Sequence, residues 1–380
     1  MAILGRKQRQ NLFICSLFLF VLGSVVTQTQ GIGEYLCQSF TLNLGDLTIQ
    51  KGPMSYFRGG ILFLWLLKIV LDALDSKRFP LFHFLILVLI VTQSLISHGR
   101  GLLFLFVFAL ASNDVDIKVI SKIILLSLTI SIAIISVLSV SWIIEDVVIE
   151  GGEWYRPVRR SLGFCNPNIL GLYILALIYA CFVVFELNLK SLLGIGLIVS
   201  SAFFISGSRS LVVGTFSLFV TYYIYKTSSQ KVRNLIPFLF LLLAVSYLVF
   251  LYQFSFSPFE SWLDRLSSFR FSYVCPVLQD LPITLFGDAS IFSEDSDPFD
   301  NSYAWCLLVY GIVGTVLFLG AVFSGMFKNS GNIKLLALCS TVCLVGLFES
   351  RMSDPVMSFP LVKVLFDGLD LHFLRHDSSS

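Results

Sequence analysis

The chain has 380 residues, of which 56% are hydrophobic, only 13% are charged and 37 are phenylalanine. So few charged side chains cannot cover the surface of a soluble domain of this size, so the composition excludes a soluble protein and indicates an integral membrane protein. The formal net charge is +2, which gives no reason to expect a nucleic-acid partner.

Apolar runs predict twelve membrane spans, because a span needs roughly 20 mainly apolar residues to cross the hydrocarbon layer. In chain order they are 12–29, 59–74, 79–97, 101–112, 119–144, 168–186, 191–206, 210–225, 235–253, 301–324, 333–348 and 356–371. The segment 101–112 is short and 356–371 contains three charged residues, so either could instead be re-entrant or interfacial. We therefore expect an all-α polytopic membrane protein that forms one membrane domain over residues 1–380.

The charge pattern orients these spans. With twelve spans, the inner segments carry 14 cations and eight acids, whereas the outer segments carry ten cations and 16 acids, as the positive-inside rule requires. The first span follows a basic start and lacks a small-residue cleavage site, which predicts a retained anchor. Three outer loops are long enough to hold chemistry, namely 30–58, 145–167 and the large loop 254–300.

Two acidic patterns invite a metal-site interpretation, and both fit poorly. Asp114-Val115-Asp116 lies on a short inner loop without a nucleotide-binding domain, and the spacing fails the calcium-loop pattern in the second group, Glu294, Asp295, Asp297 and Asp300. We therefore expect no metal and no cofactor. Outside the spans, three cysteines leave open a single disulfide between two of them, Cys37, Cys165 and Cys275.

The outer cations are almost all arginine, and they include nine of the fourteen arginines in the chain. The planar guanidinium group grips phosphate or carboxylate oxygens through two hydrogen bonds at once, so an anionic, phosphate-bearing ligand on the outer face would use this bias. The alternative is that each arginine anchors the protein to lipid phosphates at a helix end. The ten outer cations are Lys51, Arg58, Arg100, Arg156, Arg159, Arg160, Arg209, Arg265, Arg270 and Arg351.

Two of these arginines lie in tight turns between spans. Arg160 opens the sequence Arg-Ser-Leu-Gly-Phe-Cys-Asn-Pro-Asn, in which Asn166 and Pro167 predict the cap and the first residue of the next helix. Arg209 lies in Ser-Gly-Ser-Arg-Ser at 206–210, where the chain reverses between two spans. An arginine fixed at such a place is a functional candidate.

These motifs give the chain a resemblance to the Wzy-type polymerases of O-antigen, capsular and exopolysaccharide glycans, and more loosely to the related O-antigen ligases. The resemblance covers about residues 95–355 and depends on the order of the motifs rather than on any one of them. The matching segments are 160–168, 206–210, Leu-Phe-Gly at 285–287 leading to Asp300-Asn301-Ser302-Tyr303, Tyr-Gly-Ile-Val-Gly at 310–314, and Phe-Glu-Ser at 348–350.

The resemblance implies a glycosyltransferase C-like fold in the bacterial cytoplasmic membrane, with its active site on the extracytoplasmic face. It implies metal-independent transfer of a growing glycan from undecaprenyl pyrophosphate to the next lipid-linked repeat unit. Its partners would be the lipid-linked oligosaccharide, membrane lipid and a regulator of chain length. A ligase and a lipid-linked oligosaccharide flippase are the alternatives, although Lys68 is the only clear mid-span charge that a transporter could use.

The resemblance also assigns roles to individual residues. Arg160 and Arg209 would stabilise the leaving pyrophosphate, and Asp300 or Glu349 would accept the proton of the attacking hydroxyl. Related ligases have histidine before asparagine where this chain has Asp300. Two alternatives stay open, in which Asp300 merely caps a helix and Glu349 merely pairs with Arg351. The remaining expected substrate-binding residues are Arg100, Arg159, Arg265, Asn166, Asn168, Asn301 and Tyr303.

Overall fold

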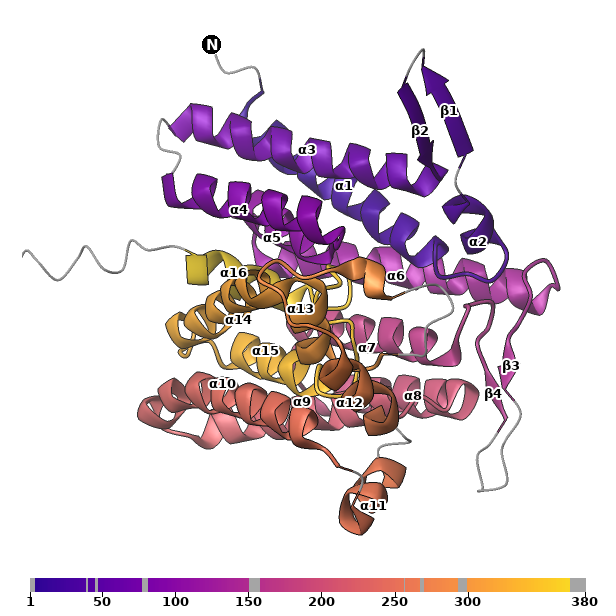
Figure 1. Cartoon of the computed structure of the whole chain (residues 1–380), viewed down its shortest axis with the longest axis vertical. Helices are drawn as coiled ribbons and strands as arrows, with labels where there is room; N and C mark the ends of the chain where they lie inside the picture. Colours follow the sequence, from indigo (N-terminus) through magenta and orange to yellow (C-terminus); the bar gives the residue numbers. More distant parts are fainter. Residues whose placement is uncertain are drawn as a thin grey trace, which may run out of the picture. The chain divides into compact units, whose positions relative to one another are not determined.

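The computed structural model describes residues 4–38, 40–44, 47–76, 81–149, 158–255, 257–266, 270–292 and 299–369. Over these residues the chain forms sixteen α-helices, one short 3-10 helix and two small antiparallel sheets of two strands each (Figure 1). The expected all-α fold class is confirmed. The chain divides into two compact units, the first formed by Met1–Arg78 with Asp114–Thr215 and the second by Phe79–Asn113 with Phe216–Ser380.

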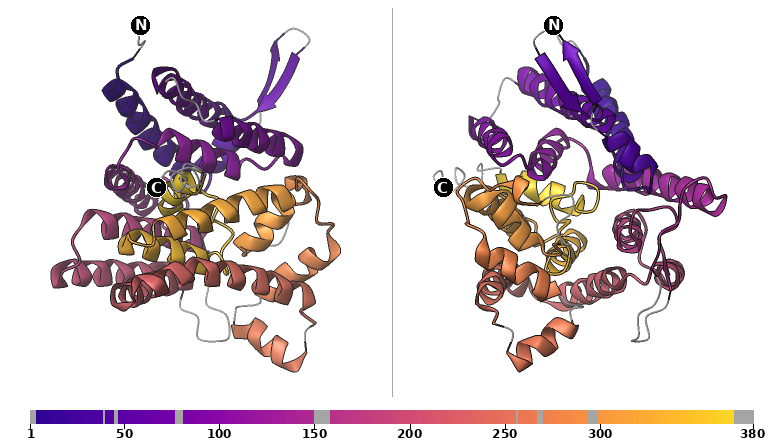
Figure 2. Two further views of the ribbon diagram at one scale, coloured as in Figure 1. Left: turned by 90° about the vertical axis from the view of Figure 1, so that its left-hand side faces the viewer. Right: turned by 45° about the vertical axis from the view of Figure 1, so that its right-hand side comes forward.

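The first unit is built on four packed helices, since α1 packs against both α3 and α6, and α6 packs against α7. The β1–β2 hairpin extends away from these helices (Figures 1 and 2). The elements are α1 (Arg6–Val26), α2 (Ile32–Cys37), β1 (Phe40–Leu44), β2 (Leu47–Lys51), α3 (Pro53–Ser76), α6 (Ile117–Val140), β3 (Val148–Ile149), β4 (Arg159–Arg160), α7 (Pro167–Val184), α8 (Leu189–Ser206) and the start of α9 (Arg209–Thr227).

In the second unit, α14 and α16 pack backbone to backbone. A Cβ atom on Gly325 would collide with the carbonyl of Val364, and one on Gly368 would collide with the carbonyl of Ala321. The elements are α4 (Leu81–Ser97), α5 (Gly101–Ala111), the rest of α9, α10 (Gln230–Gln253), α11 (Pro258–Leu266), α12 (Arg270–Asp280), η1 (Ala289–Ile291), α13 (Ser302–Val309), α14 (Gly311–Lys328), α15 (Ile333–Val345) and α16 (Pro360–Leu369).

Six helices of the described chain are long and apolar enough to cross a membrane, namely α1, α6, α7, α8, α10 and α14. Three shorter apolar helices cover 82–97, 101–111 and 333–345. The twelve predicted spans therefore all contain helix, but the count of twelve transmembrane helices stays a prediction. The helix predicted over 301–324 is wrong in one respect, because it breaks at Tyr310 into α13 and α14.

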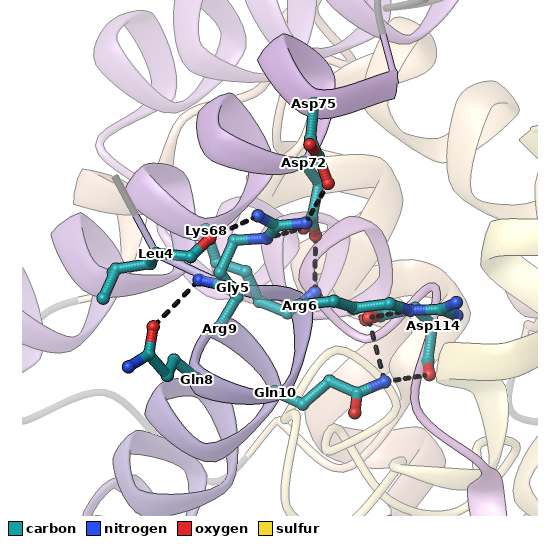
Figure 3. Close-up of polar contacts among 10 residues, drawn as sticks. All are labelled: Leu4, Gly5, Arg6, Gln8, Arg9, Gln10, Lys68, Asp72, Asp75 and Asp114. Atoms are coloured by element: carbon teal, nitrogen blue, oxygen red, sulfur yellow. Dashed lines mark hydrogen bonds and ion pairs between the residues drawn. The ribbon is translucent and has the colours of Figure 1, made fainter. Parts of the chain in front are cut away.

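A network of ion pairs joins α1, α3 and the loop that precedes α6 within the first unit (Figure 3). Lys68 is completely buried, and its Nζ lies 2.6 Å from both Asp72 and Asp114. Arg9 on α1 pairs with Asp72 at 2.6 Å and with Asp75 at 2.7 Å. We call these five residues the charge clasp.

Candidate functional site

Arg159 joins the two turn motifs of the first unit. Its Nε donates to the carbonyl of Ser206 at 2.9 Å, and its Nη2 donates to the side chain of Asn168. Its aliphatic stem lies over Gly207, where a Cβ atom would come within 2.8 Å of Arg159 Cγ. Gly207 ends α8 in the left-handed region, at φ +59°, which favours glycine. Residues 160–168 and 206–210, matched only by their order in the sequence, are therefore neighbours.

The turn before α7 follows the predicted capping pattern. Asn166 is the N-cap, its side chain accepts a hydrogen bond from the backbone N–H of Asn168, and Pro167 is the first helical residue. This structural interpretation is confirmed. Asn168 has a further contact through Arg159, so it fixes the guanidinium group. Direct ligand contact by Asn166 or Asn168 stays a prediction.

Arg209 is the first residue of α9 and is exposed. A cation at a helix N-terminus is disfavoured by the helix dipole by about 0.3–1 kcal/mol, whereas an anion there is favoured. The preceding residue, Ser208, is fully buried, and its hydroxyl has no hydrogen-bond partner among the described residues. Ser208 fits only because Gly171 on α7 has no side chain. Contact of Arg209 with an anionic ligand stays a prediction.

Arg160 pairs with an acid. Its Nε lies 2.7 Å from Asp146, and 56% of its side chain is exposed. Together with Asp146 and Ser208, the three arginines Arg159, Arg160 and Arg209 make up what we call the arginine cluster. Its charge is mainly positive, and it lies in the segments expected on the outer side.

The second unit holds an acidic cluster, formed by Arg270, Asp300 and Glu349. Arg270 begins α12, and its Nη2 lies 3.0 Å from Glu349 Oε1 and 3.7 Å from Asp300 Oδ2. The Glu349 side chain is 6% exposed and that of Asp300 is 29% exposed. One guanidinium group thus holds two carboxylates that the sequence separates by 49 residues. The predicted alternative pair for Glu349 was Arg351, but the ion pair in the structure joins it to Arg270.

Asp300 does not cap α13, although its position before the helix suggested that it would. The cap is Asn301, whose Oδ1 accepts a hydrogen bond from the backbone N–H of Ala304 and whose Nδ2 donates to Leu347. Burial raises the pKa of Asp300, against the opposing charges of Arg270 and Arg351. A carboxyl group with a raised pKa and partial exposure is suited to accept a proton.

The polypeptide around these carboxylates is fixed by hydrogen bonds. The Ser302 hydroxyl donates to the carbonyl of Glu349 and accepts from the backbone N–H of Met352 at 3.0 Å. Tyr303 is buried, and its hydroxyl donates to the carbonyl of Cys343 at 2.9 Å. Asn301 and Tyr303 therefore hold the segment that carries Glu349 against the start of α13. Substrate contact by either residue stays a prediction.

The break between α13 and α14 brings two further motifs together. Gly287 of Leu-Phe-Gly and Gly311 of Tyr-Gly-Ile-Val-Gly both have positive φ, +79° and +68°, and their backbones are in contact. The carbonyls of Thr284 and Leu285 accept hydrogen bonds from the backbone N–H groups of Ile312 and Val313. The 284–287 loop therefore caps the N-terminus of α14. It also lies against the C-terminal end of α13, the helix that Asp300 precedes.

The other predicted binding residues are less closely connected to the clusters. Arg100 is exposed and precedes Gly101, which contacts Tyr310 and Ser353 in the second unit. Arg265 is exposed in the last turn of α11. The acidic residues Glu294, Asp295 and Asp297 lie outside the described residues. Within those that are described, no group of three or more histidine, cysteine or acidic side chains could hold a metal ion.

All eight cysteines lie in the described part of the chain, where no disulfide joins any two of them, and Cys275 is buried on α12. Comparison of the chain with protein-family models, with curated proteins and with solved structures gave no match.

Proposed function

We propose that this chain is a polymerase that transfers a growing glycan from undecaprenyl pyrophosphate to the next lipid-linked repeat unit, on the outer face of the bacterial cytoplasmic membrane. The proposal is supported by the way in which the ordered motifs gather. Two of them meet in the arginine cluster, and the others meet around the acidic cluster. Each group thus has the chemistry that one part of this reaction requires.

The observation that carries the proposal is the state of Asp300. Asn301 caps α13, so the Asp300 carboxylate is not used as the cap. The Asp300 side chain is partly exposed, and its Oδ2 lies 3.7 Å from Arg270 Nη2. In the proposed reaction its carboxylate takes the proton of the acceptor hydroxyl while the hydroxyl oxygen forms a bond to the anomeric carbon of the donor. Glu349 is less suited to this role, because it is nearly buried and is hydrogen-bonded to Arg270 at 3.0 Å.

The leaving group also needs stabilisation. As the bond between the anomeric carbon and the phosphate oxygen breaks, its electron pair stays on the pyrophosphate, and fixed guanidinium groups stabilise that charge. We assign this task to Arg209 and Arg159. Arg209 lies at a helix N-terminus that favours anions, and Arg159 is held in place by Ser206 and Asn168.

Two features that would favour a transporter, a mid-span charge and a discontinuous helix, have their partners within the protein. Lys68, the mid-span charge, is neutralised by Asp72 and Asp114, and so does not await a charged solute. The discontinuous helix at Tyr310 resembles those that bind solutes in transporters, but the 284–287 loop already accepts the hydrogen bonds of its freed N–H groups. We therefore favour the enzyme.

Deleting the gene and analysing the surface glycan tests this function. A polymerase mutant should keep lipid-linked single repeats on the outer side and lack long chains. Repeats trapped inside would identify a flippase, and long unattached polymer would identify a ligase. Either result would refute the polymerase.

A reconstituted assay tests the role of Asp300. Purified protein that carries Asp300→Asn should fail to extend lipid-linked repeats, while the matched Asp288→Asn protein should extend them normally. Asp288 is also a half-buried aspartate close in sequence, but its side chain caps η1 through Ser290, a role that asparagine can keep.

A further inference from the structure

The carboxylate of Asp146 is surrounded by four hydrogen-bond donors from three consecutive residues. Arg160 Nε donates to its Oδ2 at 2.7 Å. Its other oxygen, Oδ1, accepts from the backbone N–H groups of Ser161 and Leu162, at 3.0 and 2.8 Å, and from the Ser161 hydroxyl at 3.2 Å. Residues 160–162 thus converge on one anionic group, and we call them the anion nest.

The backbone of this segment is shaped around an anion rather than for regular structure. Leu162 has φ +49°, a left-handed conformation that is unfavourable for leucine, and Gly163 follows at φ +89°. Consecutive N–H groups that point to one side in this way form anion-binding concavities in many phosphate sites. Ser161 is fully buried, and the N–H of Val147 donates to its hydroxyl at 3.0 Å, which directs the hydroxyl hydrogen toward Asp146.

The donors of the nest are those that bind phosphate. Two backbone N–H groups, a hydroxyl and a guanidinium group present the same pattern to a phosphate oxygen as to a carboxylate oxygen. The Asp146 side chain is 11% exposed while that of Arg160 is 56% exposed. The nest is therefore closed by Asp146 and is open to the surroundings on the side of Arg160, whose bond to Asp146 uses only Nε.

We propose that the anion nest is a binding site for a pyrophosphate group, and that Asp146 occupies it as an autoinhibitory contact that the substrate displaces. This inference rests on the proposed function, which supplies a lipid pyrophosphate as the ligand. A pyrophosphate carries more charge than one carboxylate, so it competes for the same donors. Asp146 belongs to the same chain, so it competes at a high effective concentration and sets the pyrophosphate level at which the nest fills.

The direct test measures pyrophosphate binding by calorimetry on the purified full chain in lipid nanodiscs. Asp146→Asn removes the competing charge but keeps an oxygen for the backbone N–H groups, so inorganic pyrophosphate should bind about tenfold more tightly than to the wild type. Glu145→Gln is the matched control, since it removes the same charge from the adjacent exposed residue and should leave the affinity unchanged. Unchanged or weaker binding by a folded Asp146→Asn protein would show that Asp146 is only a structural clamp.

A second measurement uses the wild-type chain and so does not depend on whether the variant folds. Carbodiimide labelling followed by mass spectrometry reports the accessibility of the Asp146 carboxyl group. Labelling should rise several-fold when pyrophosphate is added, and Arg160→Gln should abolish the pyrophosphate dependence. Labelling that does not respond to pyrophosphate would overturn the proposal.

The extension assay and the pyrophosphate-binding assay test the polymerase and the nest separately. If the wild type extends lipid-linked repeats but Asp146→Asn does not bind pyrophosphate more tightly, the polymerase stands and the inference is wrong. If Asp146→Asn binds more tightly and labelling responds, but no repeat is extended, the nest stands and the polymerase is wrong.

Discussion

Lys68 provides the sharpest test of the charge clasp. Its ammonium group is fully buried with two carboxylates at 2.6 Å, and removing one partner of a buried ion pair costs about 3–5 kcal/mol. In Lys68→Met, Asp72 keeps Arg9, while Asp114 keeps only Gln10 and the exposed Arg6 at 3.6 Å. Because of this partial compensation, we expect the free energy of unfolding to fall by about 3 kcal/mol, the lower end of that range. Such a decrease is a large share of the free energy of unfolding of a typical protein.

The assay is equilibrium unfolding of the purified protein in detergent, followed by circular dichroism. Lys122→Met is the control, because Lys122 is an exposed lysine on α6. The double variant Lys68→Met with Asp114→Asn removes the stranded charge as well, so it should recover about 1–3 kcal/mol of the loss. A loss below about 1 kcal/mol for Lys68→Met, or a double variant less stable than the sum of the two single changes, would refute a buried and coupled network.

Three further predictions concern the two clusters and the helix break. Gly311→Ala should strongly reduce the yield of folded protein and its thermal transition temperature, because φ at this residue is +68° and the new Cβ atom would strike the backbone of Gly287. Gly320→Ala on the same helix is the control, because a Cβ atom there has open space and should change neither quantity. Arg209→Lys should slow chain extension roughly a hundredfold, nearly as much as Arg209→Ala, if a two-pronged grip on pyrophosphate is needed; a wild-type rate would make Arg209 a lipid anchor. Because burial raises the pKa of Asp300, the rate of extension should fall with acidification at a pH above the ordinary aspartate range, and an acid limb at about pH 4 or below would contradict its role as base.

Local patterns were reliable where neighbouring residues decide the structure. The cap at Asn166 with Pro167 behind it was predictable, because the capping side chain bonds to the backbone two residues on. The same reasoning failed at Asp300, since Asn301 has equal capping ability and stands one residue closer to the helix. The sequence alone does not decide between two adjacent good caps.

Long-range partners were the part that the sequence could not supply. Arg270 appeared only as one of the outer cations, and nothing near it in the chain points to Glu349, which lies 79 residues away. For Lys68, the partner Asp72 is visible four residues along a helix, but Asp114 is 46 residues distant. The break at Tyr310 was equally hidden, because the run 301–324 is mainly apolar and contains no charged residue, and only the approach of Gly287 explains why the helix stops there.

The charge clasp also constrains the order in which the protein can be assembled during synthesis. Arg9 precedes Asp72 and Asp75 in the chain, so it has already been synthesised when these two acids of α3 leave the ribosome. Asp114 follows Lys68 by 46 residues, and at roughly 5–20 residues per second it appears about 2–9 s later. During that interval Lys68 has only Asp72 of its two carboxylate partners. The segment 81–111 is therefore synthesised while the clasp is incomplete, and a ribosome that stalls there would leave the buried ammonium group of Lys68 with one of its two carboxylate partners.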